Sequence, residues 1–324
     1  MRVFLTGGTG FIGGHVARKL RERGDDVVAL ARSPEKAAPL RELGCEVIEG
    51  GLSDEDAIRH GLRGADAAIH AAAIYRVGIP KSERKGMWES NVEGTERVLD
   101  AAIEAGVSRI VYVSTVNVFG NTNGRVVDES YERDEGEGFL SCYDETKYRS
   151  HQLAKERIAK GAPIVIVQPG GVYGPNDHSE IGNMVEQASK GKLRMKAFPD
   201  LGLNLVHVED VAEGILLALD RGRLGESYVL GGQLSTMGEA VDKAAELSGR
   251  KPTRLTLPPL LAKLSAPLGP LVGPAMGFPP NLGEAISASD GVTYLAKDDK
   301  ARRELGYSPR GLDSGLRQTL EASS

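Results

Sequence analysis

The stretch Thr6-Gly7-Gly8-Thr9-Gly10-Phe11-Ile12-Gly13 decides the fold of this chain. It follows the apolar run Val3-Phe4-Leu5 and precedes an amphipathic pattern that ends at Gly24. A glycine-rich turn between a buried strand and a helix lets the backbone approach a pyrophosphate, which the free N–H groups and the dipole of the helix N-terminus bind. The order of strand, turn and helix therefore predicts a dinucleotide-binding turn rather than a glycine turn without a ligand. The residues of the turn expected to contact the cofactor are Gly7, Gly10, Phe11, Ile12 and Gly13.

Short apolar runs continue to alternate with helical patterns beyond this turn. Continuous Val/Ile runs separated by helices indicate a parallel sheet covered on both faces, which is the doubly wound α/β architecture. We expect a Rossmann core in residues 1–170, and a small substrate-binding lobe mainly in residues 171–324, from which segments such as 204–220 return to the core. Further strands are expected at residues 27–30, 47–48, 67–70, 110–113, 164–167, 205–208 and 228–230.

The stretch Leu255 to Pro280 is rich in Pro, Gly and Leu. It is interpreted as part of the small lobe, packed over a substrate cleft. A membrane-surface segment is the alternative, but Lys263 and the prolines interrupt a continuous amphipathic helix.

The whole-chain composition excludes several classes of function. Hydrophobic residues make up 40% and charged residues 26% of the 324 residues, which allows a sizeable core. The net charge of -5, with dispersed Lys and Arg, argues against a nucleic-acid partner. Cys45 and Cys142 lack the spacing of a zinc or redox motif, so neither a metal site nor a disulfide framework is expected. The N-terminus has no signal-peptide pattern and no apolar run is long enough for a membrane span, so we expect a cytoplasmic protein.

The end of the second predicted strand reads Leu30-Ala31-Arg32-Ser33. Dinucleotide-binding folds that use NAD carry an acidic residue there, which binds the ribose 2′-hydroxyl. This chain has no carboxylate at that position, and Arg32 can bind a 2′-phosphate with two hydrogen bonds. The alternative is an ordinary surface arginine. The position and the chemistry favour NADP(H) over NAD(H).

Three further residues form a candidate catalytic set. Tyr143 and Lys147 are four residues apart in a predicted helix that runs through Ala154, so they lie on one helical face. A nearby ammonium group favours the phenolate form, so Lys147 is expected to lower the pKa of Tyr143 while it also reaches a ribose hydroxyl. Thr115 comes just after the predicted strand 110–113, where its hydroxyl is expected to face the ligand crevice and bind a substrate oxygen. The alternative for Thr115 is a helix cap or a turn.

With these motifs, the sequence resembles the extended short-chain dehydrogenases/reductases, which form the NAD-dependent epimerase/dehydratase superfamily. The resemblance covers nearly the whole chain. It implies that Ala71, Ala72 and Ala73 lie under the nicotinamide ribose, and that Pro169 and Val172 contact the carboxamide. It also implies that Asn91 lies on a helix that faces the cofactor. The motifs that carry it are His70–Ala73, Asn91–Thr95, Gln168–Pro175 and Asn204–Ala212.

Within this superfamily, the chain is most similar to bacterial dihydroflavonol 4-reductase-like proteins. Tyr75-Arg76-Val77, Gly202-Leu203-Asn204 and Lys300–Tyr307 carry that likeness. Two departures stand out. Gly50-Gly51-Leu52 replaces the usual Gly-Asp-Leu, which leaves only backbone contacts from Leu52 to the adenine. Val116-Asn117 replaces the Asp-Glu of sugar-nucleotide dehydratases, so the acid-base pair that eliminates water is missing.

The resemblance implies an NADP-dependent oxidoreductase that reduces a ketone or aldehyde. Tyr143 would donate the proton, Thr115 would polarise the carbonyl group, and Lys147 would hold the ribose. Tyr75, Trp88 and Tyr173 are candidate walls of the substrate pocket, and core packing is an equal alternative for each. The expected partner is a small carbonyl compound, and a homodimer is compatible with the sequence. A sugar-nucleotide epimerase with retained cofactor and a non-catalytic NADP-sensing regulator remain as alternatives.

Overall fold

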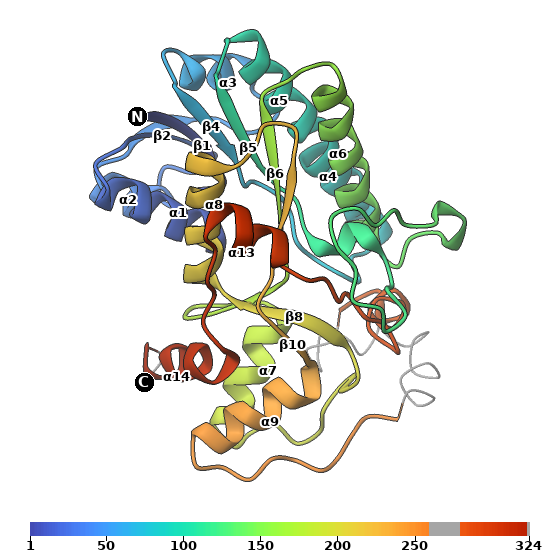
Figure 1. Ribbon diagram of the computed structural model, residues 1–324. Helices are drawn as coiled ribbons and strands as arrows, with labels where there is room; N and C mark the ends of the chain where they lie inside the picture. Colours follow the sequence, from blue (N-terminus) through green and yellow to red (C-terminus); the bar gives the residue numbers. More distant parts are fainter. Residues whose placement is uncertain (259–278, 323–324) are drawn as a thin grey trace.

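The computed structural model of the chain describes residues 1–258 and 279–322. At its centre is a seven-stranded parallel sheet, with strand order β3-β2-β1-β4-β5-β6-β9 (Figure 1). Continuous apolar runs form these strands, because both faces of the sheet are covered. The doubly wound fold predicted from the sequence is therefore confirmed. The strands are β1 Arg2–Thr6, β2 Asp26–Ala31, β3 Glu46–Glu49, β4 Ala67–His70, β5 Arg109–Val113, β6 Ile164–Pro169 and β9 Ser227–Leu230.

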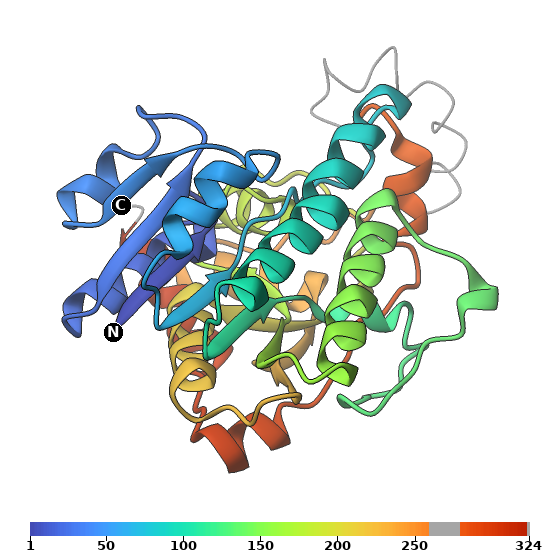
Figure 2. The ribbon, with the colours of Figure 1, turned by 90° about the horizontal axis from the view of Figure 1, so that it is seen from above.

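Helices pack on both faces of this sheet, as Figure 2 shows from above. One face carries α3, α5 and α6, whose apolar residues Ile58, Val98 and Ala154 belong to one buried cluster. The other carries α1, α2, α8 and α13, which share a second cluster around Val16 and Val211. The helices are α1 Phe11–Glu22, α2 Ala38–Glu42, α3 Glu55–Leu62, α5 Gly94–Glu104, α6 Cys142–Ala159, α8 Val208–Arg221 and α13 Asp299–Leu305.

A single long helical segment leads into α5. The helix α4 (Lys81–Trp88) continues through the π-helical turn η1 (Glu89–Glu93) directly into α5. Turns of this kind are rare in proteins, and those that occur are often found at functional sites. Here the turn contains the buried residue Asn91.

A second, three-stranded sheet lies beside the first, with strand order β10-β8-β7. Its strands are β7 Gly171–Tyr173, β8 Gly202–His207 and β10 Gln233–Thr236. It packs with α7 (Glu180–Ser189), α9 (Met237–Leu247) and α14 (Leu312–Ala322) around a separate apolar cluster. The remaining short elements are α12 (Leu282–Ser287) and the 3₁₀ turns η2 (Val116–Phe119) and η3 (Glu135–Glu137).

One strand boundary in the second half of the chain differs from the expectation, and the strand expected at 228–230 is confirmed. The strand expected at 205–208 ends at His207, because Val208 begins α8. The run 228–230 forms β9, which pairs in parallel with β6 at the edge of the large sheet. The stretch expected to cover a substrate cleft, 255–280, lies mostly outside the described residues.

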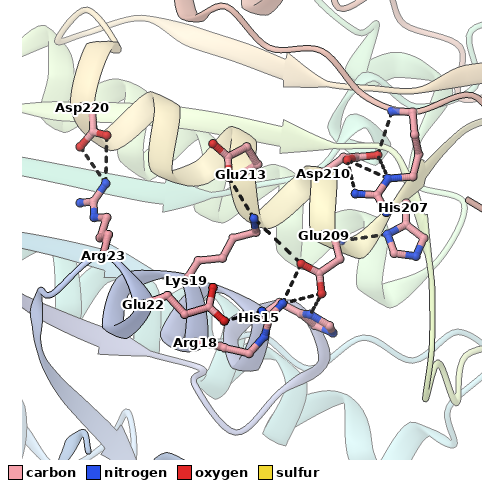
Figure 3. A network of polar contacts seen from close by, with 11 residues as sticks. His15, Arg18, Lys19, Glu22, Arg23, His207, Glu209, Asp210, Glu213 and Asp220 are labelled. Carbon is pink, nitrogen blue, oxygen red and sulfur yellow. Dashed lines mark hydrogen bonds and ion pairs between the residues drawn. The ribbon is translucent and has the colours of Figure 1, made fainter. Parts of the chain in front are cut away.

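Ion pairs join α1 to α8, as Figure 3 shows. The carboxylate of Glu209 on α8 accepts hydrogen bonds from the guanidinium group of Arg18, at 2.6 and 2.8 Å, and lies 2.7 Å from Nδ1 of His15. Asp220, further along α8, accepts from Arg23 at 2.9 Å. These contacts hold the helix that follows the cofactor turn against the returning segment 208–221.

Across residues 1–258 and 279–322, we find no helix that is both long and apolar enough to span a membrane.

Candidate active site

The glycine turn between β1 and α1 has a backbone shape that other residues would strain. Gly7 has a left-handed φ of 81°, and a Cβ atom there would lie 2.6 Å from the backbone nitrogen of Ala72. A Cβ atom on Gly13 would lie 2.1 Å from the carbonyl oxygen of Gly7. No described side chain caps α1 after Gly10, so its first N–H groups are free to bind an anion.

A cavity of about 790 Å³ opens beside this turn. Several residues predicted to bind the cofactor line it, and they come from four different strand ends. They are Gly7, Gly10, Arg32, Leu52, Ala71, Ala72 and Ala73. The other predicted contacts are not among the described lining residues, and these are Phe11, Ile12, Gly13, Asn91, Tyr143, Lys147, Pro169 and Val172.

The side chain of Arg32 enters this cavity from the end of β2. Its Cγ and Cδ atoms would lie 3.4 and 3.5 Å from a Cβ atom on Gly51. These distances are ordinary van der Waals contacts, so the stem of Arg32 packs beside Gly51. Arg32 forms no ion pair with any residue of the described ranges, so its guanidinium group is available to a ligand.

Tyr143 lies at the start of α6 and is 7% exposed. It packs with Ile79 and Met87, and its ring meets that of Tyr75 edge to face at 4.8 Å. Burial raises the pKa of the Tyr143 hydroxyl, and the neighbouring side chain of Thr115 opposes that increase. In this state the Tyr143 hydroxyl is protonated at neutral pH.

Lys147 lies one turn after Tyr143 on the same helix, and it is 3% exposed. Its Nζ atom donates to the carbonyl oxygen of Val113 at 2.9 Å and to the hydroxyl of Tyr112 at 3.2 Å. Burial is the largest influence on the pKa of Tyr143 in this structure, and the expected lowering of that pKa by Lys147 stays a prediction.

The hydroxyl of Thr115 follows β5 and caps the 3₁₀ turn η2. It accepts from the backbone N–H of Asn117 at 3.2 Å and donates to the Asn117 side chain at 3.0 Å. The helix-cap interpretation therefore describes its contacts. Capping leaves the Thr115 side chain beside Tyr143. Its hydrogen bond lowers the pKa of Tyr143 and so opposes the effect of burial.

Asn91 is 1% exposed and uses its whole amide group inside the protein. Its Oδ1 atom accepts from the N–H of Ile74 at 2.7 Å. Its Nδ2 atom donates to the carbonyl of Ile74 at 3.0 Å and to the hydroxyl of Thr146 at 3.1 Å. Asn91 thus ties the loop that carries Tyr75 to the helix that carries Tyr143.

The three candidate pocket aromatics have different surroundings. Tyr75 is 52% exposed and touches Tyr143. Trp88 is 38% exposed at the end of α4 and is not among the described residues that line the cavity at the glycine turn. Tyr173 is 2% exposed and packs edge to face on His207 at 5.6 Å, in the core of the smaller lobe. Core packing, the alternative considered for Tyr173, is what the structure shows.

Sequence reasoning missed two contacts that fix the start of α6. Asp144 is fully buried and accepts from the guanidinium group of Arg133 at 2.8 Å. Glu284, on α12, accepts from the N–H of Cys142 at 2.7 Å and from Arg84 at 2.9 Å. In the sequence, only the acidic residue Asp144 beside Tyr143 indicates an ion pair here. No sequence pattern indicates that Arg133 or Glu284 would lie next to the start of α6.

Asn204 has a structural role. It is 1% exposed, and its Oδ1 atom accepts from the N–H of Ala296 at 3.0 Å while its Nδ2 atom donates to the Ala296 carbonyl. A Cβ atom on Gly170 would lie 2.2 Å from the carbonyl oxygen of Asn204. The position at which some epimerases carry a charge therefore fastens β8 to the segment around Ala296.

With this geometry in place, comparison with known proteins identifies the class. The chain belongs to the NAD dependent epimerase/dehydratase family, whose model matches residues 3–231. It is an extended short-chain dehydrogenase/reductase, as the sequence motifs indicated, and members of this family are enzymes that bind NAD(P).

Particular relatives include reductases. A protein of Stigmatella aurantiaca, 4-hydroxy-2-methyl-3-oxo-4-farnesyl-3,4-dihydroquinoline-1-oxide ketoreductase, is 33% identical over 98% of this chain and 96% of its own. A Synechocystis protein, whose name assigns it provisionally to dihydroflavonol 4-reductase, is 31% identical over 97% of this chain and 92% of its own. The crystal structure of gox2253 superposes with a TM-score of 0.83, at 34% identity over 99% of this chain and 97% of that chain. Similar structures also include a dTDP-glucose 4,6-dehydratase and a nucleoside-diphosphate-sugar epimerase.

Proposed function

We propose that this chain is an NADP-dependent oxidoreductase that reduces a ketone or aldehyde. The observation that carries the proposal is the placement of Tyr143. It is buried and protonated, it lies beside Thr115, and Lys147 is one helical turn away. A general acid must be protonated and close to the atom that receives the proton.

Each residue has a defined task in this proposal. NADPH, when bound, supplies the hydride that is transferred to the carbonyl carbon. In this proposal the Thr115 hydroxyl exchanges its hydrogen bond to the Asn117 side chain for one to the carbonyl oxygen, and Tyr143 donates the proton that this oxygen needs. Lys147 holds the ribose and stabilises the phenolate that Tyr143 leaves behind, because an opposite charge favours the ionised form.

The proposed preference for NADP rests on Arg32. Its guanidinium group has no ion-pair partner in the described part of the chain, and Arg32 lines the cavity at the glycine turn. A planar guanidinium group matches a phosphate with two hydrogen bonds. An acidic residue, as NAD-specific sites use, is absent from the strand end 30–33.

An apolar carbonyl compound is the proposed substrate. The half-exposed ring of Tyr75 borders Tyr143, together with Ile79 and Met87. Apolar and aromatic walls with few polar groups favour apolar ligands. The name of the Stigmatella relative describes a ketoreductase for a farnesylated compound, which supports the same substrate class.

A sugar-nucleotide epimerase is the second candidate, because solved epimerases share the fold. Such an enzyme needs cations for a diphosphate. Asn204 bonds to the backbone of Ala296, and in the basic stretch 190–196 Lys190 and Lys196 pair with Glu186 and Asp242. Lys192 and Arg194 are the cations of that stretch without an ion pair among the described residues, and both are exposed rather than enclosed as a diphosphate site would need. A non-catalytic regulator is disfavoured by the retained Tyr143 and Lys147.

The deciding experiment follows NADPH absorbance with an apolar ketone such as geranylacetone, and measures the nucleotide released when the purified protein is denatured. We expect stoichiometric NADPH consumption and little retained nucleotide. Tightly retained nucleotide, together with calorimetric binding of UDP-glucose and no consumption of NADPH, would instead establish the epimerase.

A further inference from the structure

Two chain segments form a basic edge on the smaller lobe, far from the glycine turn. Residues 190–196 follow α7, and residues 250–257 follow α9 and run along the lower edge of the molecule in Figure 1. The N–H of Lys196 donates to the carbonyl of Leu255 at 2.9 Å, and the N–H of Leu257 donates to the carbonyl of Lys196 at 2.9 Å. These hydrogen bonds hold the two segments side by side.

The cations of this edge are largely free of counter-charges. The stretches 187–199 and 247–258 contain no Asp or Glu. The nearby carboxylates Glu186, Asp242 and Glu246 pair with Lys190, Lys196 and Lys243. Five other basic residues are exposed and form no ion pair within the described ranges. We call them the basic patch, and they are Lys192, Arg194, Arg250, Lys251 and Arg254.

Two large apolar side chains lie among these cations. Met195 is 41% exposed and Leu255 is 67% exposed. The hydroxyl of Thr253 donates to the carbonyl of Arg194 at 3.0 Å, which keeps the segments that carry these two side chains together. Both apolar side chains therefore meet solvent on a surface whose other large exposed side chains are mainly cations.

We propose that the basic patch, with Met195 and Leu255, docks this protein onto the surface of an anionic lipid bilayer. Lys and Arg next to an anionic membrane are attracted to its headgroups, and apolar side chains insert between them. The attraction is local, because salt screens charges beyond roughly 8 Å, so the net charge of -5 on the whole chain does not cancel it.

This partner fits better than nucleic acid or a soluble diphosphate. Nucleic acid is bound by cations and polar groups, and it offers no apolar layer for Leu255. A diphosphate site would enclose its cations, whereas Arg194 and Arg254 are exposed. The proposal is independent of the proposed reaction, since it concerns a different surface.

The test is co-sedimentation of the full chain with two kinds of vesicle. One is phosphatidylcholine alone, and the other is phosphatidylcholine and phosphatidylglycerol in equal parts. We expect binding to the anionic vesicles only, weakened by added salt. The double variants Arg194→Gln/Arg254→Gln and Met195→Ser/Leu255→Ser should each lower the partition coefficient at least about tenfold.

Matched controls alter exposed residues elsewhere. Arg63→Gln/Lys160→Gln removes two cations and Val126→Ser/Leu224→Ser removes two exposed apolar side chains, and both should bind like the wild type. If circular dichroism shows that one of these variants is unfolded, the variant Lys192→Gln/Lys251→Gln tests the contribution of the basic patch to vesicle binding independently. The proposal is overturned by equal binding to both kinds of vesicle, by no binding to either, or by patch variants that bind like the wild type. It is also overturned if the patch variants, tested in parallel with a DNA duplex, lose binding to the duplex and keep binding to the vesicles.

Discussion

The rings of Tyr75 and Tyr143 meet edge to face, with their centroids 4.8 Å apart and their planes at 84°. Tyr143 is 7% exposed whereas Tyr75 is 52% exposed, so Tyr75 shields one edge of the proposed proton donor from water. The loop that carries Tyr75 is fixed by Asn91, through hydrogen bonds to Ile74. This relationship links the proposed substrate wall to the proposed chemistry.

Removing the ring of Tyr75 should weaken substrate binding more than it slows the reaction. Tyr75→Ala deletes apolar contact area beside the reacting carbonyl, so we expect KM for an apolar ketone to rise about tenfold. Tyr75→Phe keeps the ring and should retain a KM near that of the wild type. Steady-state kinetics of both variants check this, and an unchanged KM in the Ala variant would remove Tyr75 from the pocket.

Asn91 should contribute to stability through its three hydrogen bonds. Asn91→Leu has a similar volume but leaves the backbone of Ile74 without its partners, so the free energy of unfolding should fall by about 2–3 kcal/mol. Urea denaturation measures this. The exposed Asn183, whose side-chain amide donates to the carbonyl of His178, provides the control, and Asn183→Ala should change stability by less than about 0.5 kcal/mol. Equal effects of the two substitutions would contradict the assignment.

Arg32 should set the cofactor preference. Arg32→Gln removes the charge and should weaken NADPH binding by about tenfold or more without improving NADH binding. Arg32→Asp should in addition strengthen NADH binding, because the carboxylate accepts from the ribose 2′-hydroxyl and repels the 2′-phosphate. Fluorescence titration with both cofactors measures the two constants. A wild type that binds NADH more tightly than NADPH would refute this role.

The buried His151 should make the fold sensitive to acid. Its Nδ1 atom lies 2.9 Å from the hydroxyl of Ser114, and burial lowers its pKa to about 3. In the unfolded chain the pKa of this histidine is about 6.5. Below that pH the unfolded chain binds a proton that the folded chain does not bind, so stability is lost as pH falls from 6.5 towards 3.

Replacing that histidine should therefore flatten the pH dependence. Between pH 7 and pH 5, the wild type should lose about 2 kcal/mol more of its unfolding free energy than His151→Asn. Urea denaturation at the two pH values tests this difference. Parallel losses in both proteins would show that His151 is not the group responsible.

The sequence predicted the large sheet and the glycine turn because these depend on local patterns. Val/Ile runs, helical spacing and a turn that only glycine tolerates are all visible within a few residues, and Gly7 and Gly13 behave as expected. The position of β9 beside β6 was not visible, because strand pairing depends on the path of the chain between them.

The site was predicted as a set of residues but not as a set of contacts. Spacing placed Tyr143 and Lys147 on one face of α6, as the structure has them. Spacing could not show that Lys147 would bond to Tyr112, or that burial would raise the pKa of Tyr143. Nor could it reveal Arg133 and Glu284, since these partners of α6 come from distant segments.

The most direct test of the central claim is the rate of NADPH oxidation by Tyr143→Phe with a saturating apolar ketone. The substitution removes only the hydroxyl, so NADPH should bind with an affinity near that of the wild type while proton transfer fails. We predict that kcat falls by roughly 100-fold or more, with fluorescence titration confirming that the cofactor still binds. A kcat equal to that of the wild type would contradict the account, because Tyr143 would then not be the proton donor.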